Sequence, residues 1–163
     1  MAEAIRDRLT QLSPGDAAYF AKRTDAFSAT LAEAEKRWDA VIGPYRGTKI
    51  VTYHRSWPNF AERFGLEVVG YVEPRPGIPP SPAHVLELSA EMTRQGIALI
   101  FCEPYFDLKT PEAIARRIGG EVVVLYPSVG GDPDIKTYVD LFDRDRSEEH
   151  TSELQSHVRI SYA

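Results

Sequence analysis

The 163-residue sequence has little cysteine and no long hydrophobic run. Its single cysteine, Cys102, excludes a disulfide framework and any metal site built from several cysteines. No stretch of about 18 apolar residues occurs, so we expect no transmembrane helix. The first residues, MAEAIRDRLTQLSPGD, carry charges where a signal peptide needs an apolar core, so we expect no signal peptide in this chain.

The sequence also lacks an excess of basic residues. The 19 basic and 24 acidic residues give a formal net charge of -5, the wrong sign for a protein whose main partner is nucleic acid or an anionic membrane. No P-loop, GxGxxG or GxSxG motif occurs, so nucleotide binding and a nucleophile-elbow hydrolase have no support. The remaining composition, 43% hydrophobic and 26% charged, is typical of one globular domain.

The C-terminal residues 146–163 show no apolar period of a helix or a strand. Within them, RSEEHTSELQS and ISYA resemble the in-frame translation of a common sequencing adapter, with SHVR where an index would lie. We therefore expect 146–163 to be a non-native tail, which removes His150 and His157 as candidate ligands; an ordinary polar tail is the alternative. We also expect the natural protein to continue beyond residue 145.

Helical and strand patterns alternate over residues 14–145. Apolar residues from Ala17 through Phe27 to Trp38 recur at helical spacing and predict one long helix over 14–45. Four β-branched runs predict strands at 49–53, 66–72, 97–102 and 121–126. Helices are predicted between them at 57–64, 81–95 and 110–118, and after them from about residue 135. Helical crossovers join parallel strands, so we predict an α/β fold: a long N-terminal helix followed by a four-stranded parallel sheet flanked by helices.

Caps and inward faces follow from the same pattern. Ser81 and Thr110 are expected to cap their helices, each with a proline in the first turn. The residues expected to face inward are Val85, Leu86, Leu88 and Met92 in one helix and Tyr138, Val139 and Leu141 in the last. The segment EPRPGIPPSP has five prolines and predicts a stiff loop.

Ligands of open parallel sheets bind at the carboxyl ends of the strands. The residues that follow the four predicted strands are His54 with Arg55, Glu73, Glu103, and the segment from Ser128 to Asp132. An imidazole in this position is a competent metal ligand or general base, and a hydrogen bond to a loop is the alternative. Glu103 follows a wholly apolar strand, so we expect it to be partly buried and to pair with Arg55 or a backbone amide, as a structural ion pair or as support for His54. Cys102 is expected in the core, and His84 on the surface or in helix packing.

Five blocks in one order are similar to a known family: VTYHRSWPNFAERFGLEVVG, EPRPGIPPSPAHVLEL, IFCEPYF, VVVLYPSVGG and TYVDLFD. They resemble the zinc and manganese substrate-binding proteins of ABC transporters, over residues 14–145. Members of that family have two α/β lobes joined by a long helix, and the segment DAAYFAKRTDAF is similar in sequence to that helix. The resemblance implies an inter-lobe linking helix over 1–46 and a C-terminal α/β lobe over 47–145, with the N-terminal lobe missing from this chain.

The resemblance also implies a function. Such a protein is not an enzyme; it works in the periplasm or otherwise outside the cytoplasmic membrane and delivers a divalent metal to an ABC permease. His54 matches the metal-binding histidine of the second lobe, and an imidazole there favours zinc over manganese. Ser128 stands where the family often has a carboxylate, so the fourth ligand is left open among Ser128, water, Asp132 and Asp134. Glu103 matches a family glutamate and is expected to support the site rather than bind the ion.

Two rival functions remain open from the sequence. One is a free-standing lobe that binds a small organic ligand; the other is a hydrolase-like enzyme with His54 as base and Glu103 as orienting acid. A tight zinc site needs about four donors, so we expect this chain alone to bind zinc weakly. We also expect the long helix to be frayed or prone to association, because it lacks the lobe that would cover one of its sides.

Overall fold

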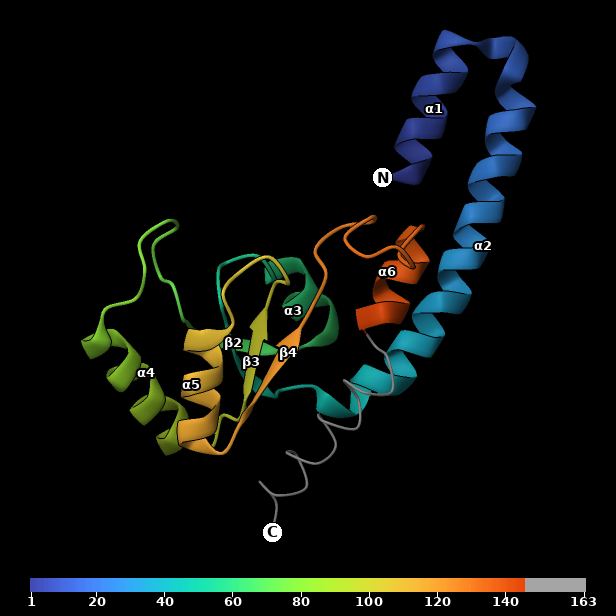
Figure 1. Ribbon diagram of the computed structural model, residues 1–163. Coiled ribbons are helices and arrows are strands. Elements are labelled where there is room, and N and C mark those ends of the chain that lie inside the picture. Colours follow the sequence, from blue (N-terminus) through green and yellow to red (C-terminus); the bar gives the residue numbers. More distant parts are fainter. Residues whose placement is uncertain (146–163) are drawn as a thin grey trace. The chain divides into compact units, whose positions relative to one another are not determined.

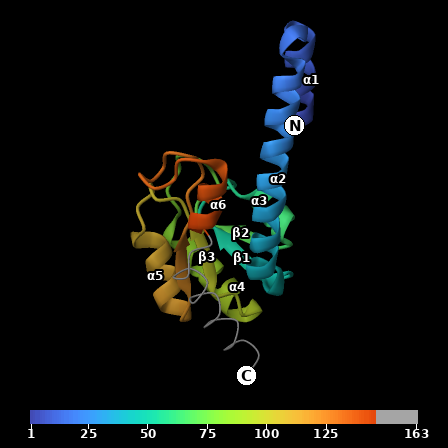
Figure 2. The ribbon, with the colours of Figure 1, turned by 90° about the vertical axis from the view of Figure 1, so that its right-hand side faces the viewer.

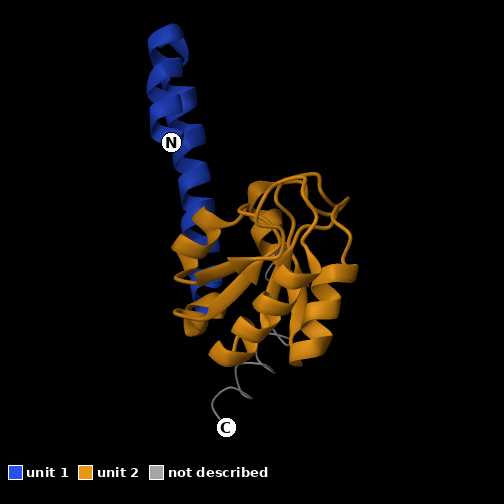
Figure 3. Ribbon diagram, turned by 90° about the vertical axis from the view of Figure 1, so that its left-hand side faces the viewer, with its two compact units in different colours: residues 1–40 blue, residues 41–163 orange. Residues whose placement is uncertain are grey.

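The computed structural model describes residues 1–145 (Figure 1). The predicted non-native tail over 146–163, with His150 and His157, lies outside the described residues. The chain divides into two compact units, Met1–Ala40, here called the hairpin unit, and the part from Val41 onward, here called the sheet unit (Figure 3). None of the helices in residues 1–145 combines the length and the apolar character that a bilayer span requires.

The hairpin unit consists of two helices that run side by side in opposite directions (Figure 1). The predicted long helix is confirmed as α2, Ala17–Ile42, which is followed by the 3-10 turn η2, Gly43–Tyr45. The resemblance implied one linking helix over 1–46, whereas residues 2–12 form a separate helix, α1 (Ala2–Leu12), which the 3-10 turn η1 (Pro14–Asp16) joins to α2. At this turn the Ser13 hydroxyl donates to Asp16 Oδ2 at 2.7 Å, and the proline begins η1, so the chain reverses direction.

Much of the apolar surface of the hairpin unit faces solvent. Helix α1 buries no residue, and Leu12 is 67% exposed. Of the apolar residues that predicted this helix, Phe27 is 44% exposed, whereas Trp38 is buried. A groove of about 380 Å³ between the helices is lined by Ile5 and Tyr19 among others. Two helices share only one contact face and cannot enclose a core between them, which explains this exposure.

The sheet unit contains the predicted four-stranded parallel sheet, in the order β2-β1-β3-β4. Its strands are β1 (Lys49–Thr52), β2 (Glu67–Tyr71), β3 (Leu99–Cys102) and β4 (Glu121–Val124). The helices are α3 (Pro58–Phe64), α4 (Pro82–Gln95), α5 (Lys109–Ile118) and α6 (Tyr138–Asp145). Strand β3 is buried along its whole length, as its continuous apolar sequence predicts.

The strand order places a topological switch between β1 and β3. The chain leaves β1 through α3 to reach β2 on one side, then returns through α4 to β3 on the other side of β1. The loops that follow the strands gather at one edge of the sheet (Figures 1 and 2). Sheets of this kind bind ligands outside the carboxyl ends of the strands at the switch, so the ends of β1 and β3 define the expected site.

Two hydrophobic clusters cover the two faces of the sheet. On one face, side chains of α4 and α5, including Met92 and Ile114, pack with Val51 and Ile100 of the sheet. On the other face, Phe60 of α3 packs with a cluster whose buried members are Ile50, Trp57, Leu99, Phe101, Val123 and Leu125. Because residues alternate along a strand, neighbours such as Ile100 and Phe101 serve opposite faces.

The ends of the helices confirm some predicted details and correct others. Ser81 caps α4, and its hydroxyl accepts from the His84 amide at 3.2 Å. Leu86 was predicted to face inward but is 49% exposed, because it lies two residues from Leu88 and therefore on the opposite side of the helix. Thr110 was predicted to cap α5 but lies inside the helix, which begins at Lys109. The Lys109 amide donates to Asp107 Oδ1 at 3.0 Å instead.

The last helix begins later than predicted. Thr137 and Asp140 form a reciprocal cap: the Asp140 carboxylate accepts from the Thr137 amide at 2.8 Å and the Thr137 hydroxyl accepts from the Asp140 amide at 3.1 Å. This cap fixes the start of α6 at Tyr138 rather than near Ile135. Leu141 faces inward as predicted, but Tyr138 is 47% exposed and its predicted inward position is wrong.

Candidate metal centre

His54 lies directly beyond the end of β1, beside the topological switch. The hydrogen bonding of the sheet continues past the strand ends: the Tyr53 amide donates to the Phe101 carbonyl at 2.7 Å, and the Glu73 amide donates to the Tyr53 carbonyl at 3.0 Å. The Thr52 hydroxyl also donates to the His54 carbonyl at 2.6 Å. The backbone that carries His54 is therefore fixed on both sides.

Aromatic rings enclose the imidazole. The Phe106 ring meets the His54 ring edge to face at a centroid distance of 4.5 Å, and the Tyr53 ring does so at 5.1 Å. Phe106 also stacks on Tyr53 at 4.7 Å. The turn that carries Phe106 is held by its amide, which donates to the Glu103 carbonyl at 3.3 Å. The side chain of His54 is only 14% exposed as a result.

Glu73 is the polar group that faces this imidazole. Its Oε2 lies 3.8 Å from His54 Nε2, and its side chain is 9% exposed. Its Oε1 accepts from the Gly77 amide at 2.6 Å, which fixes the orientation of the carboxylate. Burial, and after it the negative charge of Glu73, raises the pKa of the Tyr53 hydroxyl, so that phenol stays neutral beside the carboxylate.

The pair of His54 and Glu73 suits a divalent metal ion as part of a ligand set. Two donors that each lie about 2.1 Å from a tetrahedral zinc ion are about 3.4 Å apart. The observed 3.8 Å is too long for a hydrogen bond and slightly longer than that separation, so a small approach of the carboxylate would let both groups reach one ion. One nitrogen and one oxygen donor make half of a tetrahedral site.

The sequence placed Glu73 at a strand end but did not pair it with His54. The signal was available in the parallel register of β1 and β2, in which Thr52 is level with Tyr71. Counting two residues onward from each makes His54 level with Glu73. From the sequence, Glu103 was expected to support His54 instead, and the register of the strands was the missing information.

Glu103 is fully buried at the end of β3. The expected pairing with Arg55 is not observed: among residues 1–145, neither carboxylate oxygen of Glu103 has a hydrogen-bond partner. The Arg55 guanidinium lies instead over the Tyr71 ring, 4.5 Å from its centroid. A direct or supporting role of Glu103 at a metal site therefore stays a prediction.

Cys102 and His84 occupy the structural positions predicted for them. Cys102 is fully buried, and burial raises the pKa of its thiol to about 12, with the charge of Glu103 adding to the effect. A thiol in this state is a core group rather than a nucleophile or metal ligand. His84 Nε2 lies 2.9 Å from the Tyr71 carbonyl and joins α4 to β2.

The loop after β4 presents the remaining predicted residues. Ser128 is exposed, and its carbonyl accepts from the Gly131 amide at 3.2 Å. Asp132 is half-buried; its Oδ1 accepts from the Asp134 amide at 3.0 Å and its Oδ2 from the Tyr126 hydroxyl at 3.4 Å. Within residues 1–145, no three His, Cys, Asp or Glu side chains gather in a way that could hold one ion. Ser128 and Asp132 thus stay predicted ligands.

Comparison with known sequences gives one family over the whole of the described chain. The sequence model of the family described as "zinc-uptake complex component A periplasmic" matches residues 1–147. The high-affinity zinc uptake system protein ZnuA of Haemophilus influenzae is 25% identical over 127 residues, 78% of this chain and 38% of that protein. The zinc-binding protein AdcA of Streptococcus pyogenes serotype M6 is 26% identical over 159 residues, 97% of this chain and 31% of that protein. The chain thus spans about a third of the length of these relatives.

Solved structures share the fold. The substrate-binding protein FpvC of Pseudomonas aeruginosa in complex with Mn2+ superimposes with a TM-score of 0.74 at 24% identity, over 93% of this chain and 57% of that one. A point mutant of a Mn-bound periplasmic metal-binding protein from Candidatus Liberibacter asiaticus gives a TM-score of 0.76 at 21% identity, over 93% of this chain and 58% of that one. The architecture of the described chain is that of one part of such proteins.

Proposed function

The chain belongs to the family of periplasmic zinc-uptake component A proteins, and on this premise we propose that it captures a divalent metal ion, zinc before manganese, for delivery to an ABC permease. The family comprises metal-binding transport proteins of the ABC type rather than enzymes, which removes the hydrolase alternative. Its members work outside the cytoplasmic membrane. We propose the same location for the protein of which this chain is a part.

The observation that carries the proposal is the pairing of His54 with Glu73 at the switch point of the sheet. We propose His54 Nε2 as one ligand and Glu73 Oε2 as a second. Both side chains are nearly buried and held by neighbours, so neither needs to be ordered by the incoming ion. An imidazole with one carboxylate suits zinc, while additional oxygen donors would be needed to favour manganese.

The remaining metal ligands, beyond His54 and Glu73, are also part of the proposal. A segment with the role of a second lobe supplies further ligands, as the family resemblance implies, and Ser128, Asp132 or water takes any position left on this side. Glu103 supports the site from the end of the neighbouring strand β3. Because residues 1–145 bring no third His, Cys, Asp or Glu side chain to this pair, we expect the zinc affinity of this chain to be micromolar or weaker.

A competition titration with a zinc-responsive dye tests the proposal on the 163-residue chain. We expect weak binding of one zinc ion that is lost in His54→Ala and reduced at least about tenfold in Glu73→Gln, since a neutral amide is a poor zinc ligand. His84→Asn is the matched control, because His84 bonds a carbonyl instead of facing Glu73, and it should bind zinc as the parent chain does.

Two results would contradict the proposal. Nanomolar binding by this chain that disappears in His54→Ala would show a complete site, against the two-donor arrangement. Binding that survives in His54→Ala and is lost in His84→Asn would place the metal elsewhere. Nuclear magnetic resonance of the histidine ring nitrogens identifies which imidazole responds to zinc in either case.

A further inference from the structure

The sheet unit has a cavity on the α3 face of its sheet, whereas the aromatic ring that contacts His54 packs on the opposite face. The cavity has a volume of about 450 Å³ and is bounded by α3, the segment before it and the edge strand β2. Its walls include Trp57, Leu66 and Val68, which belong to the cluster on the α3 face, whereas the Phe106 ring that contacts His54 packs on the α4 and α5 face. A cavity of this size is in the range that holds a small organic molecule.

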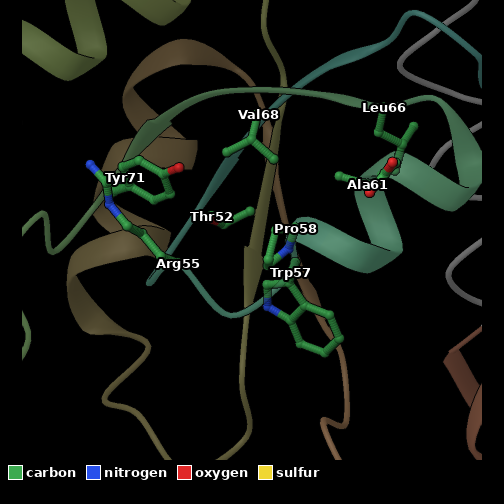
Figure 4. A pocket seen from close by; sticks show the side chains of 9 residues that line it. Thr52, Arg55, Trp57, Pro58, Ala61, Leu66, Val68 and Tyr71 are labelled. Carbon is green, nitrogen blue, oxygen red and sulfur yellow. The ribbon is translucent and has the colours of Figure 1, made fainter.

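The lining combines an apolar interior with one cation. Figure 4 shows Arg55 and Tyr71 at one side of the cavity, Ala61 and Leu66 at the other, and Val68 between them. Arg55 is the only basic residue in the lining. Its guanidinium lies 4.5 Å from the centre of the Tyr71 ring, a contact that limits the positions of a long side chain.

No carboxylate among residues 1–145 pairs with the guanidinium of Arg55. In the part of the chain that the structure describes, Arg55 forms no ion pair and no hydrogen bond to a carboxylate; its partner is the Tyr71 ring. The ring contact is a cation–π attraction and supplies no oxygen acceptor for the N–H groups of the guanidinium. Planar N–H donors of this kind match the two oxygens of a carboxylate.

Trp57 also lines the cavity, and its indole carries a buried N–H, at Nε1, without a partner among residues 1–145. Buried indole N–H groups normally find a partner, and leaving one unpaired is costly. A ligand oxygen that enters beside the indole would lower this cost after a small rotation of the ring toward the cavity.

We propose that this cavity binds a small apolar carboxylate, with the carboxylate on the Arg55 guanidinium and the apolar body against Val68, Ala61 and Leu66. Glu62, the one acidic residue of the lining, disfavours a second negative charge on the ligand. The occupant is therefore a monocarboxylate. The ligand would not use the donors proposed for the metal, because neither His54 nor Glu73 lines the cavity.

Hexanoate is the probe, and the indole N–H signal of Trp57 is the readout. The sequence has two tryptophans, so a ¹H–¹⁵N spectrum of the 163-residue chain shows two indole signals, and Trp57→Phe assigns them. With EDTA present, so that no metal can recruit a carboxylate, we expect a saturable shift of the Trp57 signal with hexanoate. Hexanol and hexylamine share the apolar body and should bind at least about tenfold more weakly, as the loss of a charge-assisted hydrogen bond predicts.

Two variants of exposed residues test the role of charge in the cavity. Arg55→Gln should weaken hexanoate binding at least about tenfold, and circular dichroism verifies that the variant is folded. Glu62→Gln removes the acidic group and should leave hexanoate binding unchanged or slightly tighter. No saturable shift with hexanoate, equal binding of hexanol, or unchanged hexanoate binding in Arg55→Gln would each overturn the proposal.

Discussion

The hairpin unit and the sheet unit differ in how far they bury their large apolar side chains. In the hairpin unit, α1 has no buried residue, and Tyr19 is 61% exposed. In the sheet unit, Phe64, Met92 and Ile100 are almost fully buried. The two units belong to one sequence of ordinary composition, so the difference arises from architecture and not from a shortage of apolar residues in either part.

The sheet unit encloses two cores because its helices cover both faces of a sheet, whereas the hairpin unit is a pair of helices with a groove between them. A layered α/β arrangement can bury its own apolar surface, and a two-helix pair needs another layer. The sheet unit should therefore dominate the stability of this chain. In the proposed function, the segment that supplies the other metal ligands also provides this missing layer.

Amide hydrogen exchange gives the largest expected contrast between the units. Amides of β3, such as those of Ile100 and Phe101, should exchange only through unfolding of the sheet unit, while those of α1 open locally. With a typical domain stability of at least about 5 kcal/mol, protection in β3 should exceed that in α1 by at least about a thousandfold. Uniformly strong protection over residues 2–42 in a monomer would remove the contrast.

Truncation of one aliphatic side chain in each unit gives the next largest effect. Ile100→Ala removes a fully buried side chain from a central strand and should lower the free energy of unfolding by about 2–5 kcal/mol. Leu12→Ala changes a side chain that is 67% exposed and should stay within about 0.5 kcal/mol. Urea unfolding followed by circular dichroism measures both. Equal losses would mean that Leu12 is covered in solution.

Glycine substitutions sharpen the same contrast at the level of the backbone. A Cβ atom at Gly120 would lie 2.3 Å from the Ala98 carbonyl oxygen, which already accepts the Glu121 amide at 2.8 Å. Gly120→Ala should therefore cost about 1–3 kcal/mol in thermal or urea unfolding. Gly15 in the hairpin unit has nothing within 4 Å of such an atom, so Gly15→Ala should be neutral or slightly stabilising. A tolerated Gly120→Ala would show that this β3–β4 approach is looser than described.

Capping residues give the smallest of these effects. Ser81→Ala removes the acceptor for the His84 amide at the start of α4 and should cost about 1 kcal/mol in unfolding by urea. Ser13→Ala removes an exposed hydroxyl that contacts Asp16 and should change the stability by less than about 0.5 kcal/mol. A larger effect at Ser13 than at Ser81 would indicate that the turn of the hairpin unit matters more to stability than the start of α4.

The fold was largely predictable because periodicity and punctuation agree within the sheet unit. Each predicted strand was found, and helices α3 and α4 end at Gly65 and Gly96 in the left-handed region, with φ of 70° and 66°. Helix α1 was missed, although Ile5, Leu9 and Leu12 recur at helical spacing. The helical spacing of these residues was a usable signal for a separate helix, even though α1 buries none of them.

The site was predictable in its place but not in its pairings. His54 was predicted as a site residue because it follows β1, and the carboxyl ends of parallel strands lie at one edge of the sheet, where ligands bind. Which carboxylate faces that imidazole depends on strand register, and whether Arg55 reaches Glu103 depends on the direction of a long side chain. Neither is encoded by local pattern: Arg55 lies on Tyr71, and Glu73 takes the position beside His54.

The continuation of the sheet hydrogen bonds past β1 and β2 has a thermodynamic consequence for metal capture. The backbone of Tyr53, the residue before His54, is hydrogen-bonded to Phe101 and to Glu73. The two proposed donors, His54 and Glu73, are therefore preorganised when the chain folds. The conformational entropy of this half of the site is lost during folding and not during binding. Ion exchange would then be governed by donors outside this lobe: their withdrawal would release the ion, while His54 and Glu73 stay in place for the next one.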